Sequence, residues 1–127
     1  MYQISKITIL SLLLLGMAAC QEDPEYKALS FTELSAPPMG YDTSIESDEI
    51  RVPAGILQVV KADVEYMGDR YLIGSFVDLS SQDERVFTVI PMTKKNHFLL
   101  VGKAAGHTCM DVTVNGDWEE CIDVTIE

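Results

Sequence analysis

The chain of 127 residues has little positive charge, few cysteines and no apolar run long enough to cross a membrane. Its 9 Lys and Arg stand against 20 Asp and Glu, which gives a formal net charge of −11 at pH 7. A field of this sign repels phosphate groups, so we expect no nucleic acid partner and no binding to anionic lipid headgroups through the overall charge of the protein. The longest apolar run, from Ile7 to Met17, is shorter than the roughly 20 residues that a membrane-spanning helix needs.

This short apolar run leads to a cysteine. Lys6 precedes the run, and the small residues Ala18 and Ala19 stand directly before Cys20. A basic residue, a short apolar segment and small residues have the layout of a secretory signal peptide. With a cysteine at the junction, the segment resembles the signal peptide of bacterial lipoproteins. The resemblance implies that residues 1–19 are removed and that Cys20 is the lipidation site. An ordinary secretory signal with an incidental cysteine is the alternative.

The residue after Cys20 indicates in which membrane such a lipoprotein is anchored. Gln21 stands where lipoproteins retained in the inner membrane of enteric bacteria carry Asp. The resemblance therefore implies a lipid-anchored protein of the outer membrane that faces the periplasm or the cell surface. Attachment through three acyl chains is firm, because two lipid signals already suffice. Loss of residues 1–19 removes Lys6 and leaves 8 Lys and Arg against 20 Asp and Glu, a formal charge of −12.

The other two cysteines, Cys109 and Cys121, are separated by a short stretch near the end of the chain. An exported protein matures in an oxidising compartment, so we expect these two residues to form a disulfide. Two free thiols for metal or redox chemistry are the alternative, although the chain has no CxxC motif.

Residues 20–49 have the composition of a lipidated N-terminus followed by a flexible tether. Prolines interrupt the segment at 36–40, and residues 42–49 are mostly acidic and polar. As a flexible coil, the tether would span roughly 30 Å; alternation at Leu29 and Phe31 allows one short strand within it. The acidic residues lack the spacing of an EF-hand loop, so we interpret them as a solvated segment and not as a calcium site.

Residues 50–127 show short apolar or alternating runs separated by turn residues. No helical periodicity extends over three turns after residue 20. Short runs that recur about every ten residues predict an all-β sandwich domain. The runs are 50–52, 56–60, 63–66, 71–79, 86–90, 97–101, 108–114 and 122–126.

The last two runs form a predicted hairpin whose inner face is apolar. Met110 and Ile122 belong to the inner face, whereas Cys109 and Cys121 belong to the polar face. A two-residue turn at Asn115-Gly116 would place the cysteines on opposite faces. We therefore predict a three-residue loop over 114–116, which pairs Cys109 directly with Cys121 and leaves Glu120 on the inner face.

Five segments in residues 85–127 carry a family resemblance: Val89–Pro91, Leu99–Lys103, Gly106–Thr108, Val112–Gly116 and Val124–Ile126. They resemble the closing part of bacterial immunoglobulin-like modules and are similar to the N-terminal domain of tight-adherence pilus secretins. The resemblance implies a small immunoglobulin-like β-sandwich and a pilus or envelope assembly protein as partner.

The sequence nominates no catalytic or metal-ligating residues, and we expect neither an enzyme nor a cofactor. His97 and His107 lack the spacing of a zinc site, and the serines lack a nucleophile-elbow sequence. We expect a non-catalytic structural or assembly module of a cell-envelope machine, with the final strand, Ile122 to Ile126, as a candidate docking edge. Alternatively, the acidic residues on this strand only protect the edge against aggregation. The alternative function is that of a binding module for a glycan or small ligand, which would stack on aromatic residues. These are Tyr41, Tyr66, Tyr71 and Trp118.

Overall fold

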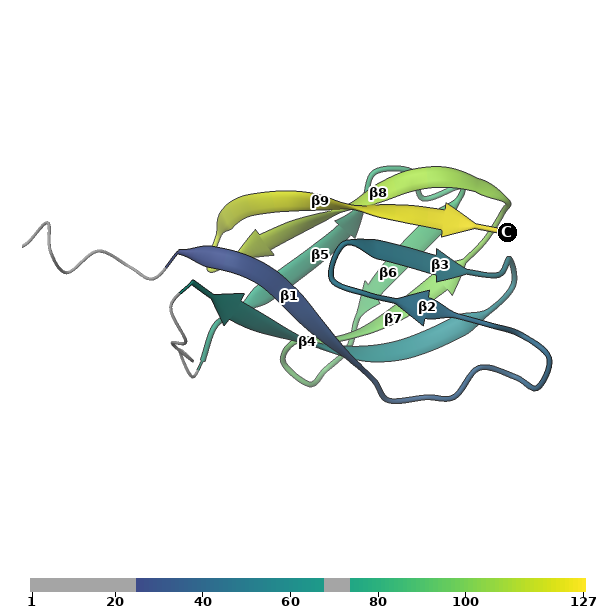
Figure 1. Ribbon diagram of the computed structural model, residues 1–127, viewed down its shortest axis with the longest axis horizontal. Helices are drawn as coiled ribbons and strands as arrows, with labels where there is room; N and C mark the ends of the chain where they lie inside the picture. The colour runs from purple at the N-terminus through teal and green to yellow at the C-terminus, as the bar shows by residue number, and fades with distance from the viewer. Residues whose placement is uncertain (1–24, 68–73) are drawn as a thin grey trace, which may run out of the picture.

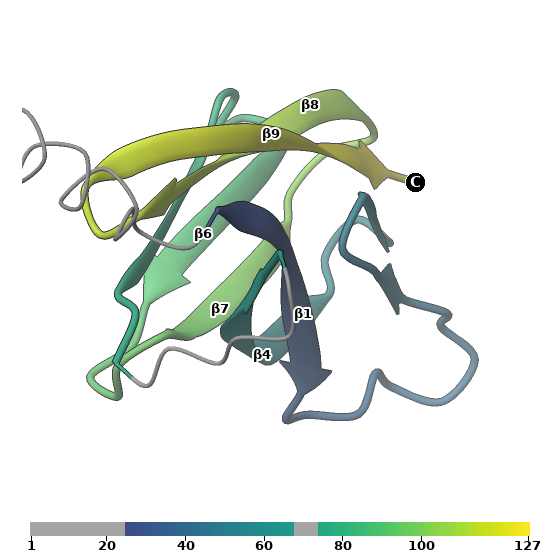
Figure 2. The same cartoon turned by 60° about the vertical axis from the view of Figure 1, so that its left-hand side comes forward.

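The computed structural model describes residues 25–67 and 74–127, and these residues form two packed β-sheets (Figures 1 and 2). The all-β prediction is confirmed. The strands are Tyr26–Glu33 (β1), Ser44–Ile45 (β2), Glu49–Val52 (β3), Leu57–Tyr66 (β4), Val77–Ser81 (β5), Phe87–Pro91 (β6), His97–Gly102 (β7), Gly106–Val114 (β8) and Asp117–Ile126 (β9). Within these ranges, no helix is long and apolar enough to cross a membrane. The predicted signal peptide and the lipidation site Cys20 lie outside the described residues.

The order of the strands is that of an immunoglobulin-like sandwich. One sheet has the order β1-β4-β7-β6 and the other has the order β2-β3-β9-β8-β5. The first sheet and the β5-β8-β9 part of the second reproduce the ABED and CFG sheets of the immunoglobulin fold. All neighbouring strands run antiparallel except β3 and β9, which are parallel. The predicted fold class is therefore confirmed.

Alternation along the strands builds the core between the two sheets, because successive side chains point to opposite faces. Each sheet contributes buried apolar residues, which include Phe87, Leu100, Met110, Val112 and Ile122. One polar side chain, Gln58, is also fully buried. Its amide donates to the backbone carbonyl of Ser35 and thereby fastens the loop after β1 to β4.

Much of the segment predicted as a tether belongs to the sandwich, which corrects the boundary at residue 50. Strand β1 pairs with β4 from Tyr26 to Glu33, and Leu29 is only 1% exposed in the core. Strand β3 begins at Glu49 and pairs with the last strand. This segment is ordered as a strand because burial of Leu29 on the inner face of the first sheet, beside β4, stabilises its pairing. The sandwich therefore begins at Tyr26.

Two further runs differ from the prediction. The runs 56–60 and 63–66 form one continuous strand, β4, because Lys61 points to the outer face and does not interrupt the inner row. Of the run predicted at 71–79, the structure describes residues from 74 onward and places β5 at Val77–Ser81. Val77 and Leu79 are buried on one face, as their alternation predicts.

Candidate binding surfaces

The outer face of the four-stranded sheet carries an apolar patch that the sequence analysis did not identify. Cross-strand register aligns Leu57 with Val101, and Val59 with Leu99 and Ile90. Leu34 adds to this row, since its amide donates to the carbonyl of Val59. We call these six residues the apolar patch: Leu34, Leu57, Val59, Ile90, Leu99 and Val101.

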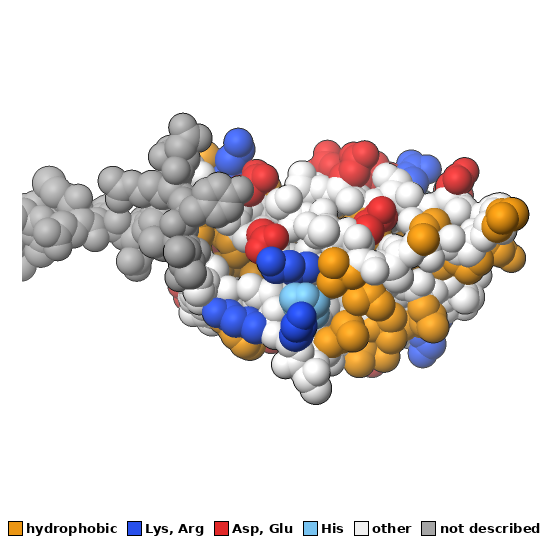
Figure 3. Space-filling view, turned by 90° about the horizontal axis from the view of Figure 1, so that it is seen from below, with side chains coloured by type: hydrophobic (Ala, Val, Ile, Leu, Met, Phe, Trp, Pro, Cys, Tyr) orange, Lys and Arg blue, Asp and Glu red, His pale blue; other side chains and the backbone are white. Residues whose placement is uncertain are grey.

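The apolar patch is exposed around its border and half-buried at its centre, Val59 and Leu99. Leu57 is 56% exposed, Leu34 is 49% exposed and Ile90 is 45% exposed. Figure 3 looks onto this side of the molecule and shows hydrophobic side chains gathered in the half away from the start of β1. A signal was present in the sequence, because the runs 56–60 and 97–101 are apolar at both parities. A strand with one face in water normally alternates.

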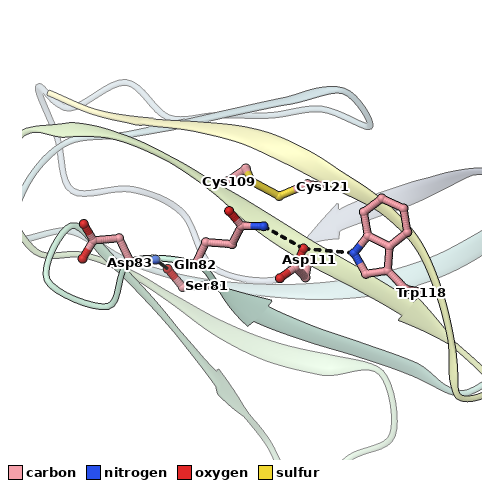
Figure 4. Close-up of a disulfide and its surroundings, with 7 residues drawn as sticks. All are labelled: Ser81, Gln82, Asp83, Cys109, Asp111, Trp118 and Cys121. Atoms are coloured by element: carbon pink, nitrogen blue, oxygen red, sulfur yellow. Dashed lines mark hydrogen bonds between the residues drawn. A yellow bond between two sulfur atoms is a disulfide. The ribbon is translucent and has the colours of Figure 1, made fainter.

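Cys109 and Cys121 form a disulfide with a Cα–Cα distance of 5.5 Å, which confirms the predicted pair. The bond joins the neighbouring strands β8 and β9 on the outer face of the five-stranded sheet (Figure 4). It does not connect the two sheets, unlike the disulfide of antibody domains. The cysteines belong to the outer face, as the alternation of the hairpin predicts.

The loop of this hairpin differs from the prediction. Asn115 and Gly116 both have positive φ, at 51° and 89°, and form a two-residue turn between Val114 and Asp117. Two left-handed residues in succession are what a type I′ turn requires. The predicted three-residue loop over 114–116 is therefore wrong.

With the two-residue turn alone, the inner residues of β8 would lie opposite outer residues of β9 beyond the turn. One extra residue in β9, the bulge at Glu119, corrects this mismatch. Thr113 pairs with Trp118, whereas the preceding residue of β8, Val112, pairs with Glu120. Because of Glu119, Cys109 and Cys121 lie on the same face of the sheet. They are diagonal neighbours across the two strands and not a directly opposed pair. The predicted direct pairing is wrong, since Cys109 lies opposite Asp123 and Cys121 opposite Asp111.

The bulge also sends Trp118 and Glu120 to opposite faces of the sheet. Glu120 points inward, as predicted, and accepts a hydrogen bond of 2.5 Å from the hydroxyl of Tyr26 in the other sheet. Burial raises the pKa of Tyr26, and the hydrogen bond to the Glu120 carboxylate raises it further. The inward carboxylate thus has a partner, and the pair ties β1 to β9 at one end of the sandwich.

Trp118 lies on the outer face of the five-stranded sheet and is 63% exposed. Its indole Nε1 donates to Asp111 Oδ1 at 3.0 Å, and Gln82 Nε2 donates to the same oxygen at 3.1 Å (Figure 4). The hydrogen bond to Asp111 holds the indole beside β8. This is the one predicted aromatic residue that lies exposed on a strand within 25–67 and 74–127.

The remaining predicted aromatic residues do not gather around Trp118. Tyr41 belongs to the loop between β1 and β2, at the other end of the sandwich (Figure 1). Tyr66 is half-buried at the end of β4 and shares a hydrogen bond with Ser75. Tyr71 lies outside the described residues. The structure therefore assembles no aromatic platform from Tyr41, Tyr66 and Trp118.

The two histidines belong to different sheets. His97 begins β7, and its Nδ1 lies 2.7 Å from the carbonyl of Lys95. His107 lies in β8, with Nδ1 at 3.1 Å from the hydroxyl of Thr125. Across the described ranges, no three His, Cys, Asp or Glu side chains group in a way that could hold a metal ion.

The final strand is not an edge, which corrects the predicted docking position. Strand β9 lies between β3 and β8 in the five-stranded sheet, so Ile122 to Ile126 has a partner on each side. Among the described strands, β1 and β6 border one sheet and β2 and β5 border the other. The final strand therefore offers no free edge to a partner strand.

Comparison with known proteins finds a distant structural likeness. No protein-family model matches the chain, and no curated protein matches it. Among solved structures, the chain is similar to domains 4 and 5 of the S-layer protein SbsC, with 15% sequence identity and a TM-score of 0.49. The match covers 72% of this chain and 53% of the S-layer chain, so this chain spans about half the length of that structure.

Proposed function

We propose that the protein is an outer-membrane-anchored lipoprotein that acts as a non-catalytic structural or assembly module of a cell-envelope machine, such as a pilus or secretin accessory. The observation that supports this proposal is the apolar patch on the four-stranded sheet. Contiguous exposed apolar surface of a soluble domain is typical of a protein interaction site. The lipid anchor itself rests on the resemblance of residues 1–20.

The shape and chemistry of the apolar patch favour a protein partner over a small ligand. Its side chains come from adjacent strands and so form one face of a sheet. Lys61 and His97 follow the patch along β4 and β7, opposite each other. A flat apolar area with a polar border has the composition of a protein interface.

Cross-linking in intact cells tests this proposal. A photoreactive residue at Leu57 should yield a discrete adduct, which Ile90→Glu should abolish while the protein remains folded and membrane-bound. Met39 lies outside the apolar patch and is fully exposed, so a photoreactive residue there serves as the matched control. An adduct at Leu57 that Ile90→Glu does not weaken would show that the apolar patch is not the docking surface.

A glycan-binding module is the second candidate, and the surroundings of Trp118 favour it. An exposed indole face can stack on the apolar face of a sugar ring, and Asp111 and Gln82 beside it offer polar groups for sugar hydroxyls. Trp118→Ala should then abolish retention of the protein on cell-wall polysaccharide. Unchanged retention would exclude this role for Trp118.

A further inference from the structure

Exposed apolar side chains gather at a second place, the end of the sandwich where β1 starts. Met67 directly follows β4, Phe76 directly precedes β5, Met92 directly follows β6, and Trp118 lies at the start of β9. Each of these four side chains is at least 45% exposed. We call this surface the β1 end; Figure 1 shows the starts of β1 and β9 and the end of β4 at its left.

Hydrogen bonds connect the segments of the β1 end. Phe76 N donates to the side chain of Asn115 at 2.8 Å, and Asn115 N donates to the carbonyl of Phe76 at 2.8 Å. The side chain of Asn96 accepts from Val77 N at 2.9 Å, which adds the turn between β6 and β7. Met67 N donates to the carbonyl of Glu25 at 2.8 Å, directly before β1.

The position of β1 limits how far this end can lie from a lipid anchor. Strand β1 begins at Tyr26, six residues after Cys20. A fully extended chain covers at most about 3.6 Å per residue, so these six steps reach about 20 Å at most. If Cys20 carries lipid, as the proposed function requires, the β1 end is the part of the sandwich held beside the bilayer.

We propose that the β1 end contacts the lipid surface, with Trp118, Phe76 and Met67 in the headgroup region. Tryptophan favours this region because its indole is both apolar and polar. Lys27 and Lys94 also lie on segments of this end, and long lysine side chains reach phosphate groups while their stems cover apolar surface. The same end carries the carboxylates Asp117 and Glu119 on β9.

This orientation leaves the apolar patch accessible. The patch residues Leu34, Leu57 and Val101 belong to the end of the sandwich opposite the start of β1, because β1 ends, β4 begins and β7 ends there. Lipid contact at the β1 end therefore does not compete with protein contact at Leu34, Leu57 and Val101, whereas Ile90, two residues before Met92, lies nearer the β1 end.

Trp118 is the only tryptophan of the chain, so its fluorescence reports on the β1 end alone. The full lipidated protein is placed in phosphatidylethanolamine–phosphatidylglycerol vesicles, with or without a quencher attached near the lipid headgroup. We expect a blue shift of the emission and a loss of intensity with the quencher. The double variant Trp118→Phe, Tyr41→Trp moves the fluorophore to the opposite end and should show neither effect.

A second variant tests whether the short segment between Cys20 and β1 holds the β1 end beside the bilayer. About 20 Gly and Ser residues inserted between Glu22 and Asp23 add a coil of roughly 25 Å. This variant should float with the vesicles as the original protein does, but its Trp118 should be quenched less.

Flotation separates the inference from the proposed function on which it rests. Protein that floats with the vesicles but shows unquenched Trp118 would overturn the lipid contact and leave the anchor intact. Quenching of the Tyr41→Trp variant as strong as that of Trp118 would overturn the orientation. If the protein carries no acyl chain and does not float, both the anchor and the lipid contact fail.

Discussion

At the scale of single residues, the contact between Tyr26 and Glu120 links the two sheets and has a chemical signature. The phenol donates to a carboxylate at 2.5 Å, so loss of the phenol proton would bring two negative charges together. Burial first, and this hydrogen bond second, raise the pKa of Tyr26 in the folded protein. An unfolded tyrosine ionises near pH 10. The contact therefore stabilises the fold fully below about pH 10 and loses its effect as the pH rises further.

Substitution of Tyr26 by Phe should lower the free energy of unfolding at pH 7 by about 1.5–3 kcal/mol, the usual contribution of a hydrogen bond to a charged group. Above about pH 10 the difference between the two proteins should shrink, because the original protein loses this contribution as ionisation becomes favourable in the unfolded chain. Urea unfolding followed by circular dichroism at both pH values measures this. Tyr41→Phe, in an exposed loop, is the control. If the difference in unfolding free energy is the same at pH 7 and above pH 10, the hydrogen bond from Tyr26 to Glu120 is not its cause.

At the scale of elements, the β8–β9 hairpin shows what alternation can and cannot determine. The inner row and the disulfide were predictable, because both depend only on which residues share a face. Alternation did not show where β9 carries its one unpaired residue, which is Glu119. A three-residue loop and a two-residue turn with a bulge at Glu119 both place Cys109 and Cys121 on one face. Local backbone preference decides between them, since Asn115-Gly116 favours the type I′ turn.

Deletion of Glu119 should remove the bulge and leave a regular hairpin. Six residues would then join Val112 to Glu120, and the turn at Asn115-Gly116 and the disulfide would remain. We expect the free energy of unfolding to change by about 1 kcal/mol or less, as for most surface changes. Thermal melting and titration of free thiols measure the outcome.

Deletion of Thr113 is the matched control, because it also leaves six residues between Val112 and Glu120. It moves the turn away from Asn115-Gly116 and turns Val114, which is 5% exposed, toward solvent. Exposure of a valine costs about 1.5–3 kcal/mol. Equal melting temperatures for the two deletions would show that the bulge does not lie at Glu119.

At the scale of the whole molecule, the two-sheet architecture was predictable from residues 50–127. The alternation at Leu29 and Phe31 allowed a short strand, but it did not predict that this strand belongs to the sandwich. Leu29 is a single fully buried side chain within a largely polar segment, and its partner strand lies about thirty residues later in the chain. Composition cannot reveal pairing over this separation when two prolines follow the strand. The apolar patch escaped prediction because runs that are apolar at both parities, 56–60 and 97–101, do not show which parity faces the core; the register of β4, β7 and β6 shows it.

Truncation measures whether β1 belongs to the cooperative unit. A chain that begins at Pro24 should fold and unfold in one transition. A chain that begins at Glu49 lacks β1 and the short edge strand β2, and loss of β1 uncovers Val60, Ala62 and Val64, which are at most 7% exposed. Loss of Leu29 packing alone should cost about 2–5 kcal/mol, and a small domain has only about 5–15 kcal/mol in total. We therefore expect the shorter chain to lose cooperative melting.

The variant Leu29→Ala in the chain from Pro24 separates loss of packing from loss of the whole strand. It should retain the strand pairing between β1 and β4 and lose about 2–5 kcal/mol of unfolding free energy. Circular dichroism melting and dispersion of backbone amide resonances distinguish a destabilised sandwich from an unfolded one. If the chain from Glu49 melts at the same temperature as the chain from Pro24, β1 is peripheral and the sandwich begins near residue 50. That result would also lengthen the linker to Cys20, so the lipid anchor would no longer hold the β1 end within about 20 Å of the bilayer.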